Sequence, residues 1–373
     1  MKKPINAFPG YEYIPPCKEN NWHAQNMYRG IDVGFGGYVY AEPGMYYDVA
    51  LLDVANMHGA SIENLNLFGE YTQRYADLRT IRNSIKHHDL ETPKNMFDGK
   101  LKKYLEDEKE ADDLAAALKL PLNQTYGITS ASFDNPARDS RNVNNIVALR
   151  GALFMKTLQD EIVKKGYRVV SVKTDSYKIP DATDEIIDFI MEFGEKYGYQ
   201  FEHEATYDRM CLVNDAVYIA KYDDHGVRNK GGKHANEWTA TGAQFQVPYV
   251  FKTLFSKEPI EFDDLCETKS VSSTLYLDFN EGLPEDEHNY HFVGRVGQFC
   301  PIKPGHGGGL LLREKDGKYN AATGTKGYRW KESEVVKELG QEDSIDHEYY
   351  RRLVDDAVET ISKFGDFEMF ISE

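Results

Sequence analysis

The sequence has few cysteines and no long hydrophobic run. Its four cysteines are far apart and form no C-x-x-C pair, which argues against a zinc site and against a disulfide framework. No segment approaches the roughly 18 consecutive apolar residues that a transmembrane helix needs. No apolar segment follows Lys2 and Lys3, as one would in a secretory signal. We therefore expect a soluble, intracellular protein with no membrane partner.

Positive charge is also scarce. The 373 residues carry 44 Lys or Arg against 61 Asp or Glu, and this net charge of -17 by itself argues against a nucleic-acid partner. The charge is uneven, however, because residues 291–331 contain eight Lys or Arg and only two acids, among aromatic residues and glycines. Basic side chains and backbone N–H groups in glycine loops suit phosphates. This basic segment is a candidate nucleic-acid contact, and an incidental charge bias in a β-rich loop region is the alternative.

Two acidic residues stand at the ends of predicted strands. Residues 47–55 form a strongly apolar strand with Asp53 near its end, and residues 167–179 indicate a hairpin with Asp175 at its tip. A solvated turn residue is the alternative for Asp175, since Asp is common in turns. A carboxylate that ends a buried strand is costly unless a cation meets it. On neighbouring strands the two carboxylates could hold divalent metal ions.

The segment between these strands has a helical pattern. One helix is predicted over about 63–86 and a second over about 101–126, which together form an antiparallel hairpin. The second carries Lys119, Asn123 and Tyr126 on one stripe, for which a solvated helix edge is the alternative. Pro121 should kink this helix.

The order of the remaining elements predicts the fold class. Helices are expected over about 142–164, 183–197 and 346–364, and strands near 200–205 and 211–222. Strand, helix, two strands, helix and strand describe an α+β fold, a ferredoxin-like split βαβ sheet with the helical hairpin inserted after its first strand. A polar, Gly-rich stretch places a domain boundary near residue 235.

Together these features indicate phosphoryl transfer to a nucleotide. Two metals about 3.5 to 4 Å apart can activate an attacking oxygen and stabilise a leaving one. Lys119, projecting from a helix over that site, would supply positive charge to a triphosphate.

Three segments resemble a known family. Residues 53–62 (DVANMHGASI) are similar to motif A of family B DNA polymerases, residues 119–127 (KLPLNQTYG) to motif B, and residues 173–176 (KTDS) to motif C. The resemblance is to the polymerases of tailed bacteriophages and extends from about Gly36 to the C-terminus. It implies an N-terminal segment and the first part of a palm at 1–62, fingers at 63–127, the second part of the palm at 128–235 and a thumb at 236–373.

The resemblance also implies an activity and a set of site residues. The activity would be DNA-directed DNA synthesis, in which the 3′-hydroxyl of a primer attacks a dNTP, with two Mg²⁺ ions for which Mn²⁺ can substitute. The implied metal ligands are Asp53, Asp175 and the carbonyl of Val54. The implied nucleotide contacts are Lys119, Asn123, Tyr126, Gly127, Arg82 with Arg79 as its rival, and the backbone of Asn56, Met57 and His58. The implied DNA contacts are Tyr218 and Lys221, with Arg295, Lys326 and Arg329 from the basic segment.

The sequence departs from the family pattern at several positions. Lys173 stands where motif C has an Asp, Gln124 where motif B has a Ser, and His58 where motif A has the Tyr that excludes a ribose. About 50 residues precede Asp53, too few for the proofreading exonuclease of the family, so we expect that activity to lie on a separate subunit. The implied setting is viral DNA replication in the cytoplasm of an infected bacterial host.

Two other classes of protein are alternatives. A nucleotidyl cyclase or primase-like polymerase could use a similar sheet, but the inserted helical hairpin argues against it. A non-catalytic DNA-binding subunit of a split polymerase is the other alternative. The presence of Asp53, Lys119, Asn123 and Asp175 together argues against loss of the active site.

Overall fold

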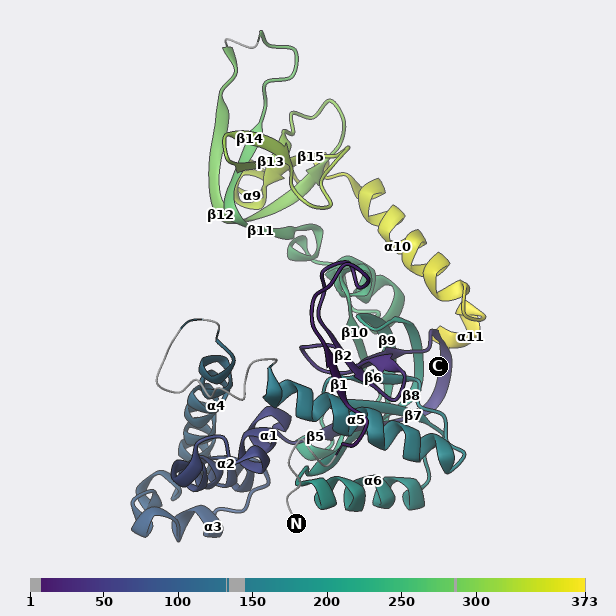
Figure 1. Ribbon diagram of the computed structural model, residues 1–373. Helices are drawn as coiled ribbons and strands as arrows, with labels where there is room; N and C mark the ends of the chain where they lie inside the picture. Colours follow the sequence, from purple (N-terminus) through teal and green to yellow (C-terminus); the bar gives the residue numbers. More distant parts are fainter. Residues whose placement is uncertain (1–7, 132, 134–144, 285–286, 373) are drawn as a thin grey trace. The chain divides into compact units, whose positions relative to one another are not determined.

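The computed structural model describes residues 8–131, 133, 145–284 and 287–372 (Figure 1). The chain forms two compact units, one of Met1–Asp215 with Ala220–Thr239 and one of Ala216–Ile219 with Ala240–Glu373. Helices and antiparallel sheets occur in both, which confirms the α+β class. No helix in the described part of the chain is both long and apolar enough to cross a bilayer.

A seven-stranded sheet supports the first unit. Its order is β10-β9-β8-β5-β7-β6-β4, and the four central strands β8, β5, β7 and β6 are antiparallel to their neighbours. Those four have the order of a split βαβ sheet, in which the first strand along the chain lies between the fourth and the third. The strands are β4 (Val39–Ala41), β5 (Gly44–Val54), β6 (Ser171–Lys173), β7 (Ser176–Pro180), β8 (Phe201–Asn214), β9 (Val217–Val227) and β10 (Trp238–Thr241).

Two helices bury one face of this sheet. Helix α5 (Ile146–Lys164) and helix α6 (Asp184–Tyr197) contribute Leu149, Leu153 and Ile190 to a core that also contains Leu52 and Tyr177 from β5 and β7. Each of these side chains is at most 2% exposed. This layer holds the ends of β5 and β7 in place, and both aspartates lie at those ends.

The strands differ from the prediction at one place. Residues 200–205 and 211–222 were expected to be two strands, but β8 is a single strand that continues through Asp208 and Arg209. The polar pair interrupts the apolar pattern without ending the strand, because its backbone still pairs with β5, where Arg209 opposes Tyr47. The turn instead falls at 215–216, between β8 and β9.

The helical insert has three main helices where the sequence predicted two. They are α1 (Met57–Leu65), α2 (Thr72–Lys86) and α4 (Glu108–Ser130), with the short α3 (Glu91–Lys94) between the last two. The predicted helix over 63–86 is wrong because Asn66 adopts a left-handed conformation, with φ of 49°, and ends α1 there. The second helix begins at Glu108 rather than near 101, because the carboxylate of Asp107, directly before it, accepts hydrogen bonds from the N–H groups of Lys109 and Glu110.

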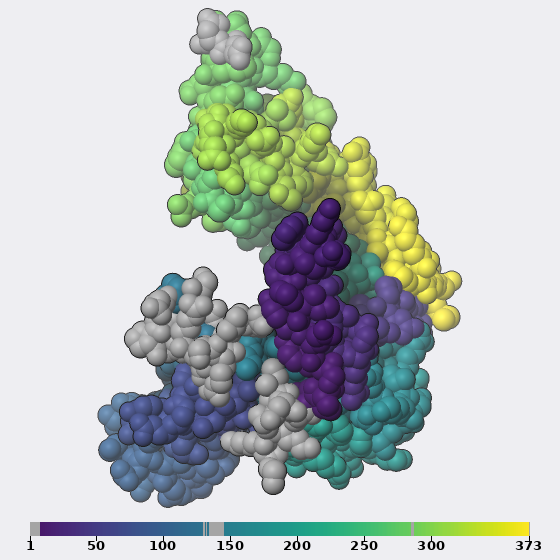
Figure 2. Space-filling view, in the orientation of Figure 1, coloured from purple at the N-terminus to yellow at the C-terminus, as the bar shows by residue number. Residues whose placement is uncertain are grey.

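The helices of the insert pack on one another through small apolar clusters. Ile81 and Ile85 of α2 meet Ala111 and Ala115 of α4, and all four are buried. Helix α4 continues through Pro121, and the Pro121 carbonyl accepts a hydrogen bond from the Thr125 hydroxyl. Helices α2 and α3 lie in the blue surface at the lower left of Figure 2.

A small N-terminal sheet was not predicted. Strands β1 (Glu12–Ile14), β2 (Gln25–Tyr28) and β3 (Ile31–Asp32) pair in this order. The Tyr28 hydroxyl lies 2.9 Å from the Thr157 hydroxyl, which anchors the small sheet on α5.

The second unit is built on a five-stranded antiparallel sheet of order β14-β13-β11-β12-β15 (Figure 1). Its core contains Leu275, Leu277, Phe299 and Trp330, none more than 1% exposed. The strands are β11 (Glu267–Asp278), β12 (Tyr290–Ile302), β13 (Leu310–Lys315), β14 (Lys318–Ala321) and β15 (Arg329–Glu332). The helices are α7 (Ala243–Gln246), α8 (Pro248–Phe251), α9 (Ser333–Glu338), α10 (His347–Ser362) and α11 (Phe367–Ile371). Helix α10 confirms the helix predicted over 346–364.

Candidate active site

The two aspartates lie on neighbouring strands, as the sequence predicts. Asp53 is the last residue but one of β5 and opposes Ser176 of β7, directly after Asp175. The Val54 N–H donates a hydrogen bond of 2.9 Å to the carbonyl of Asp175. In the β6–β7 turn, the Thr174 N–H donates a hydrogen bond of 2.9 Å to the carbonyl of Tyr38, which anchors the turn to the N-terminal segment. Backbone pairing therefore fixes the positions of both carboxylates.

The electrostatics of the pair favour a bound cation. Burial, followed by the charges of Asp175, Glu204 and Glu202, raises the pKa of Asp53 to about 8. Burial also raises the pKa of Asp175, and Glu204 adds to the effect. Neither aspartate forms an ion pair within the described residues, so the charges of Lys86 and Lys178 offset only part of the cost of bringing two acids together. A divalent ion would offset it.

The donor set suits a hard metal ion. Groups of three or more His, Cys, Asp or Glu that could hold a metal are absent from the described residues. Asp53, Asp175 and the carbonyl of Val54 supply oxygen donors only, and Mg²⁺ commonly takes one or two carboxylates and fills its other positions with water and substrate phosphate. The residues present therefore fit Mg²⁺ better than a metal that needs a full protein cage.

Glu202 is a site residue that sequence reasoning missed. It opposes Asp53 across the β5–β8 pair, and its carboxylate lies 3.0 Å from Nε2 of His87 and 3.9 Å from Nζ of Lys86, at the end of α2. It also accepts a hydrogen bond of 3.2 Å from Asn229. Alternation along β8 could have indicated Glu202, but its place beside Asp53 depends on the strand register.

The first turn of α1 follows directly after Asp53. Asn56 has φ of 52°, and its side chain accepts a hydrogen bond of 3.1 Å from the Gly59 N–H. The Met57 side chain is buried, and a Cβ on Gly151 would lie 2.7 Å from its sulfur. The N–H groups of Met57 and His58, in the first turn, have no intrahelical acceptor, and such a helix end suits an anion.

The Tyr126 ring of α4 contacts the His58 ring of α1. The two rings lie 4.1 Å apart at 39°, and burial lowers the pKa of His58, which favours its neutral form. Asn145, which sequence reasoning missed, donates to the Tyr126 hydroxyl at 3.0 Å and to the Phe35 carbonyl at 2.9 Å. These contacts connect α1, α4 and the N-terminal segment through the side chains of His58, Tyr126 and Asn145.

The structure distinguishes the two candidate arginines of α2. Arg79 donates from Nε and Nη2 to one oxygen of Glu63, at 3.1 and 2.5 Å. Arg82 is half-buried, its Nε has no hydrogen-bond partner, and burial lowers its pKa. Arg82 is therefore the arginine that a ligand could engage without breaking an existing pair.

We expect Arg79→Ala to lower the free energy of unfolding by about 2 kcal/mol, because two charge-assisted hydrogen bonds to a partly buried carboxylate are lost. Urea denaturation measures the change. Arg74→Ala is the control, since Arg74 is exposed on the same helix over the Tyr71 ring. An unchanged midpoint in Arg79→Ala would show that the Glu63 contact contributes little to stability.

Lys119 and Asn123 lie exposed on α4, on the same stripe as Tyr126. Neither forms a hydrogen bond or an ion pair with another described residue, and no direct contact joins them to the aspartates. Their predicted contact with a triphosphate stays a prediction.

The two residues predicted to contact a primer both lie on β9. Tyr218 and Lys221 are three residues apart on β9, and an odd separation places their side chains on opposite faces of a strand. The ammonium of Lys221 lies 5.9 Å from the ring centre of Trp238. Their contact with a primer stays a prediction for each residue separately.

The three basic residues of the 291–331 segment are also separated. Arg329 opposes Ile302 on β12, seven residues from Arg295, which is about 23 Å along the strand. Arg329 is already paired with Glu281 at 2.6 Å, while Lys326 is exposed in the loop before β15. The structure does not gather them into one patch, and their contact with DNA stays a prediction for each residue separately.

Without metal, we expect the unfolding temperature to fall as pH rises between the ordinary Asp pKa of 3.8 and about 8. In this range the folded state keeps a proton on Asp53 that the unfolded state releases, so rising pH favours unfolding. Thermal denaturation in EDTA at several pH values measures the slope. Asp53→Asn should flatten it, and an equal slope in the variant would contradict the raised pKa.

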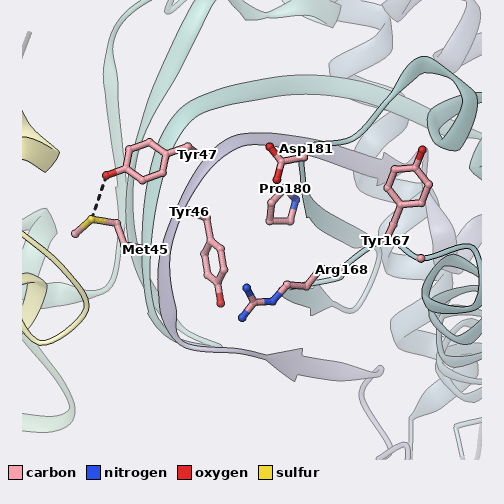
Figure 3. Close-up of a pocket in the computed structure, with 8 residues that line it drawn as sticks. Met45, Tyr46, Tyr47, Tyr167, Arg168, Pro180 and Asp181 are labelled. Atoms are coloured by element: carbon pink, nitrogen blue, oxygen red, sulfur yellow. Dashed lines mark hydrogen bonds between the residues drawn. The ribbon is translucent and has the colours of Figure 1, made fainter.

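A separate hollow of about 540 Å³ lies at the opposite end of β5. Figure 3 shows Tyr46 and Arg168 facing each other, with the guanidinium carbon 5.1 Å from the ring centre. Arg168 is also paired with Glu42. No predicted site residue borders this hollow, so it is not part of the candidate site. Its lining consists of Met45, Tyr46, Tyr47, Gly166, Tyr167, Arg168, Pro180 and Asp181.

Comparisons with known proteins give a similarity of fold. No protein-family model matches the sequence, and no curated protein does. Among solved structures, the family B DNA polymerase from the hyperthermophilic archaeon Pyrobaculum calidifontis is similar, with a TM-score of 0.47 and 12% identity. The match covers 87% of this chain and 46% of that polymerase, so this chain spans less than half of its length. A TM-score this low supports no conclusion about activity, and function is inferred below from the site residues.

Proposed function

We propose that the chain is a DNA-directed DNA polymerase that adds nucleotides from dNTPs to a primer–template. The observation that carries the proposal is the pair Asp53 and Asp175, which backbone pairing holds on neighbouring strands, with raised pKa values and no ion pair to a described residue. Neighbouring buried acids with raised pKa values are typical of a site that binds a metal for catalysis. The three motifs that contain the site residues support the choice of substrate.

Each neighbouring group has a role that follows from its position. Asp53, Asp175 and the Val54 carbonyl would hold Mg²⁺, which when bound lowers the pKa of the primer 3′-hydroxyl and stabilises the departing pyrophosphate. The N–H groups of Met57 and His58 would bind phosphate oxygens at the start of α1.

Arg82 and Lys119 would neutralise the charge of the triphosphate as it grows in the transition state. Asn123 would support the same contact. Tyr126 with His58 would form the wall beside the incoming base and sugar, and because His58 is held against Tyr126, it occupies a fixed position there.

The proposal extends to the parts of the chain and to its setting. The seven-stranded sheet would be the palm, the helical insert the fingers, and the second unit the thumb of a family B type enzyme from a tailed bacteriophage. Its work would be viral DNA replication in the host cytoplasm, with Mg²⁺ or Mn²⁺.

Primer extension tests the proposal. The purified chain, a labelled primer on a longer template, Mg²⁺ and four dNTPs should yield products that end at the template 5′ end, and EDTA should abolish them. Synthesis without a primer would indicate a primase-like enzyme instead. DNA binding without any incorporation would indicate a non-catalytic subunit.

A further inference from the structure

Two cysteines that are far apart in the sequence meet in the core of the second unit. Glu267 of β11 opposes Phe299 of β12, so the register continued by one residue places Cys266 opposite Cys300. Their sulfurs lie 3.4 Å apart, and the two residues are 5% and 0% exposed. Both are free thiols in this structure. Side chains that oppose each other at this separation can be joined by a disulfide after small rotations.

A hollow of about 490 Å³ lies beside Cys266. Phe262 lines it, and the Phe262 carbonyl accepts a hydrogen bond of 3.3 Å from the Cys266 thiol. Ser333 and Lys337 line it as well, and both interact with the same thiol. A small solute that enters the hollow is thus brought near a sulfur that is otherwise buried.

The two thiols are not equivalent. A hydrogen bond from Cys300 lowers the pKa of Cys266, and the charge of Lys337 acts in the same direction. Burial and the charge of Asp263 oppose this effect only in part. The contact between the two sulfurs, together with burial, raises the pKa of Cys300. Because the thiolate is the reactive form of cysteine, Cys266 is the sulfur that an oxidant in the hollow would meet as a nucleophile.

The core around the sulfurs also contains an unused hydrogen-bond donor. The Tyr350 hydroxyl is buried and has no hydrogen-bond partner among the described residues. Burial and Glu267 raise its pKa, and charge on Cys300 or Cys266 adds to the effect, which places the hydroxyl near both sulfurs. An oxygen added to Cys266 would be costly to bury without a donor. Tyr350 could supply that donor.

We propose that Cys266 and Cys300 form a peroxide-sensitive thiol pair, in which Cys266 reacts first and Cys300 completes a disulfide. The Cys266 thiolate attacks one oxygen of hydrogen peroxide and becomes a sulfenic acid, and the hydroxide released takes up the proton that the thiol had lost. Cys300 then attacks that sulfur, and its proton leaves with the sulfenic oxygen as water. Two thiols and one peroxide thus give one disulfide and two waters. The inference is independent of the proposed polymerase activity.

Peptide mapping of the full chain tests the proposal. The reduced protein, freed of reductant, is exposed to hydrogen peroxide in its folded state, its remaining thiols are alkylated, and a digest is analysed by mass spectrometry. A linked peptide pair that contains Cys266 and Cys300 should appear, and dithiothreitol should remove it. Cys211→Ser is the control and should form the same linked pair, because Cys211 is buried in the first unit.

Serine variants separate the two roles. Cys300→Ser should accumulate sulfenic acid at Cys266, detected as its adduct with dimedone, whereas Cys266→Ser should give no such adduct at Cys300. A dimedone adduct at Cys300 in Cys266→Ser would overturn the assigned order of reaction.

Two results with the unmodified chain would overturn the proposal as a whole, whether or not the serine variants fold. One is absence of the linked pair at a peroxide concentration that oxidises free glutathione. The other is a linked pair that forms only after the chain has been unfolded in guanidinium chloride, because the folded arrangement would then have no part in the reaction.

Discussion

Asp53→Asn and Asp175→Asn should each reduce primer extension by about 10³-fold or more. Asparagine keeps the shape of the side chain but removes the charge that would hold the metal, and a loss of about 4 kcal/mol in transition-state stabilisation corresponds to that factor. Glu202 is too engaged to replace either acid, since it already contacts His87 and Asn229. Single-turnover extension at saturating DNA measures the rate.

A matched control exists at the end of β7 that lies opposite Asp175. Asp181 follows β7, is exposed, and has φ of 51°, a conformation that asparagine tolerates well. Asp181→Asn should extend primers at the normal rate. Near-normal extension by Asp53→Asn or Asp175→Asn would contradict the assignment. Loss of both extension and DNA binding would indicate damage to the fold rather than loss of a metal ligand.

Arg82→Ala should lower kcat/KM for dNTP by about 10- to 100-fold, through kcat as well as KM. Its guanidinium is already partly removed from water and its Nε has no partner, so a triphosphate can engage it at little further cost. A hydrogen bond between charged groups contributes about 1.5 to 3 kcal/mol, which gives the expected range. Steady-state kinetics at saturating primer–template separates the two parameters.

Arg79→Ala is the matched comparison on the same helix. It should reduce stability and leave dNTP kinetics nearly unchanged, because Arg79 is committed to Glu63. The reverse outcome, a kinetic loss in Arg79→Ala and none in Arg82→Ala, would exchange the two roles. Inhibition of primer extension by tripolyphosphate reports binding of the phosphate chain without its incorporation. Arg82→Ala should weaken this inhibition.

The predictable parts of the structure were those fixed by short-range patterns. The apolar run before Asp53 and the β-branched run before Asp175 are strands, and the hairpin between β6 and β7 forms where Thr174 turns. Period-2 alternation and turn residues are enough to place such elements. The order of strands and helices then predicted that the two aspartates lie on neighbouring strands.

The parts that failed depend on single residues or on distant pairing. Asn66 ends α1 through a left-handed backbone, although the apolar pattern continues past it. Glu202 and Asn145 join the site only through strand register and the meeting of distant helices. No local pattern carries this information.

The contacts of Glu202 have a mechanical consequence for the helical insert. Lys86 and His87 tie the end of α2 to a strand beside Asp53, so this end acts as a pivot for the helices. Arg82 lies one turn before the pivot, and the far end of α2, at Thr72, lies about 20 Å away along the helix. If the insert swings when a ligand enters, the Thr72 end travels furthest and Arg82 least. An arginine one turn from this end keeps its interaction with Glu202 during such a swing, so the insert can open without carrying that charge away from β8.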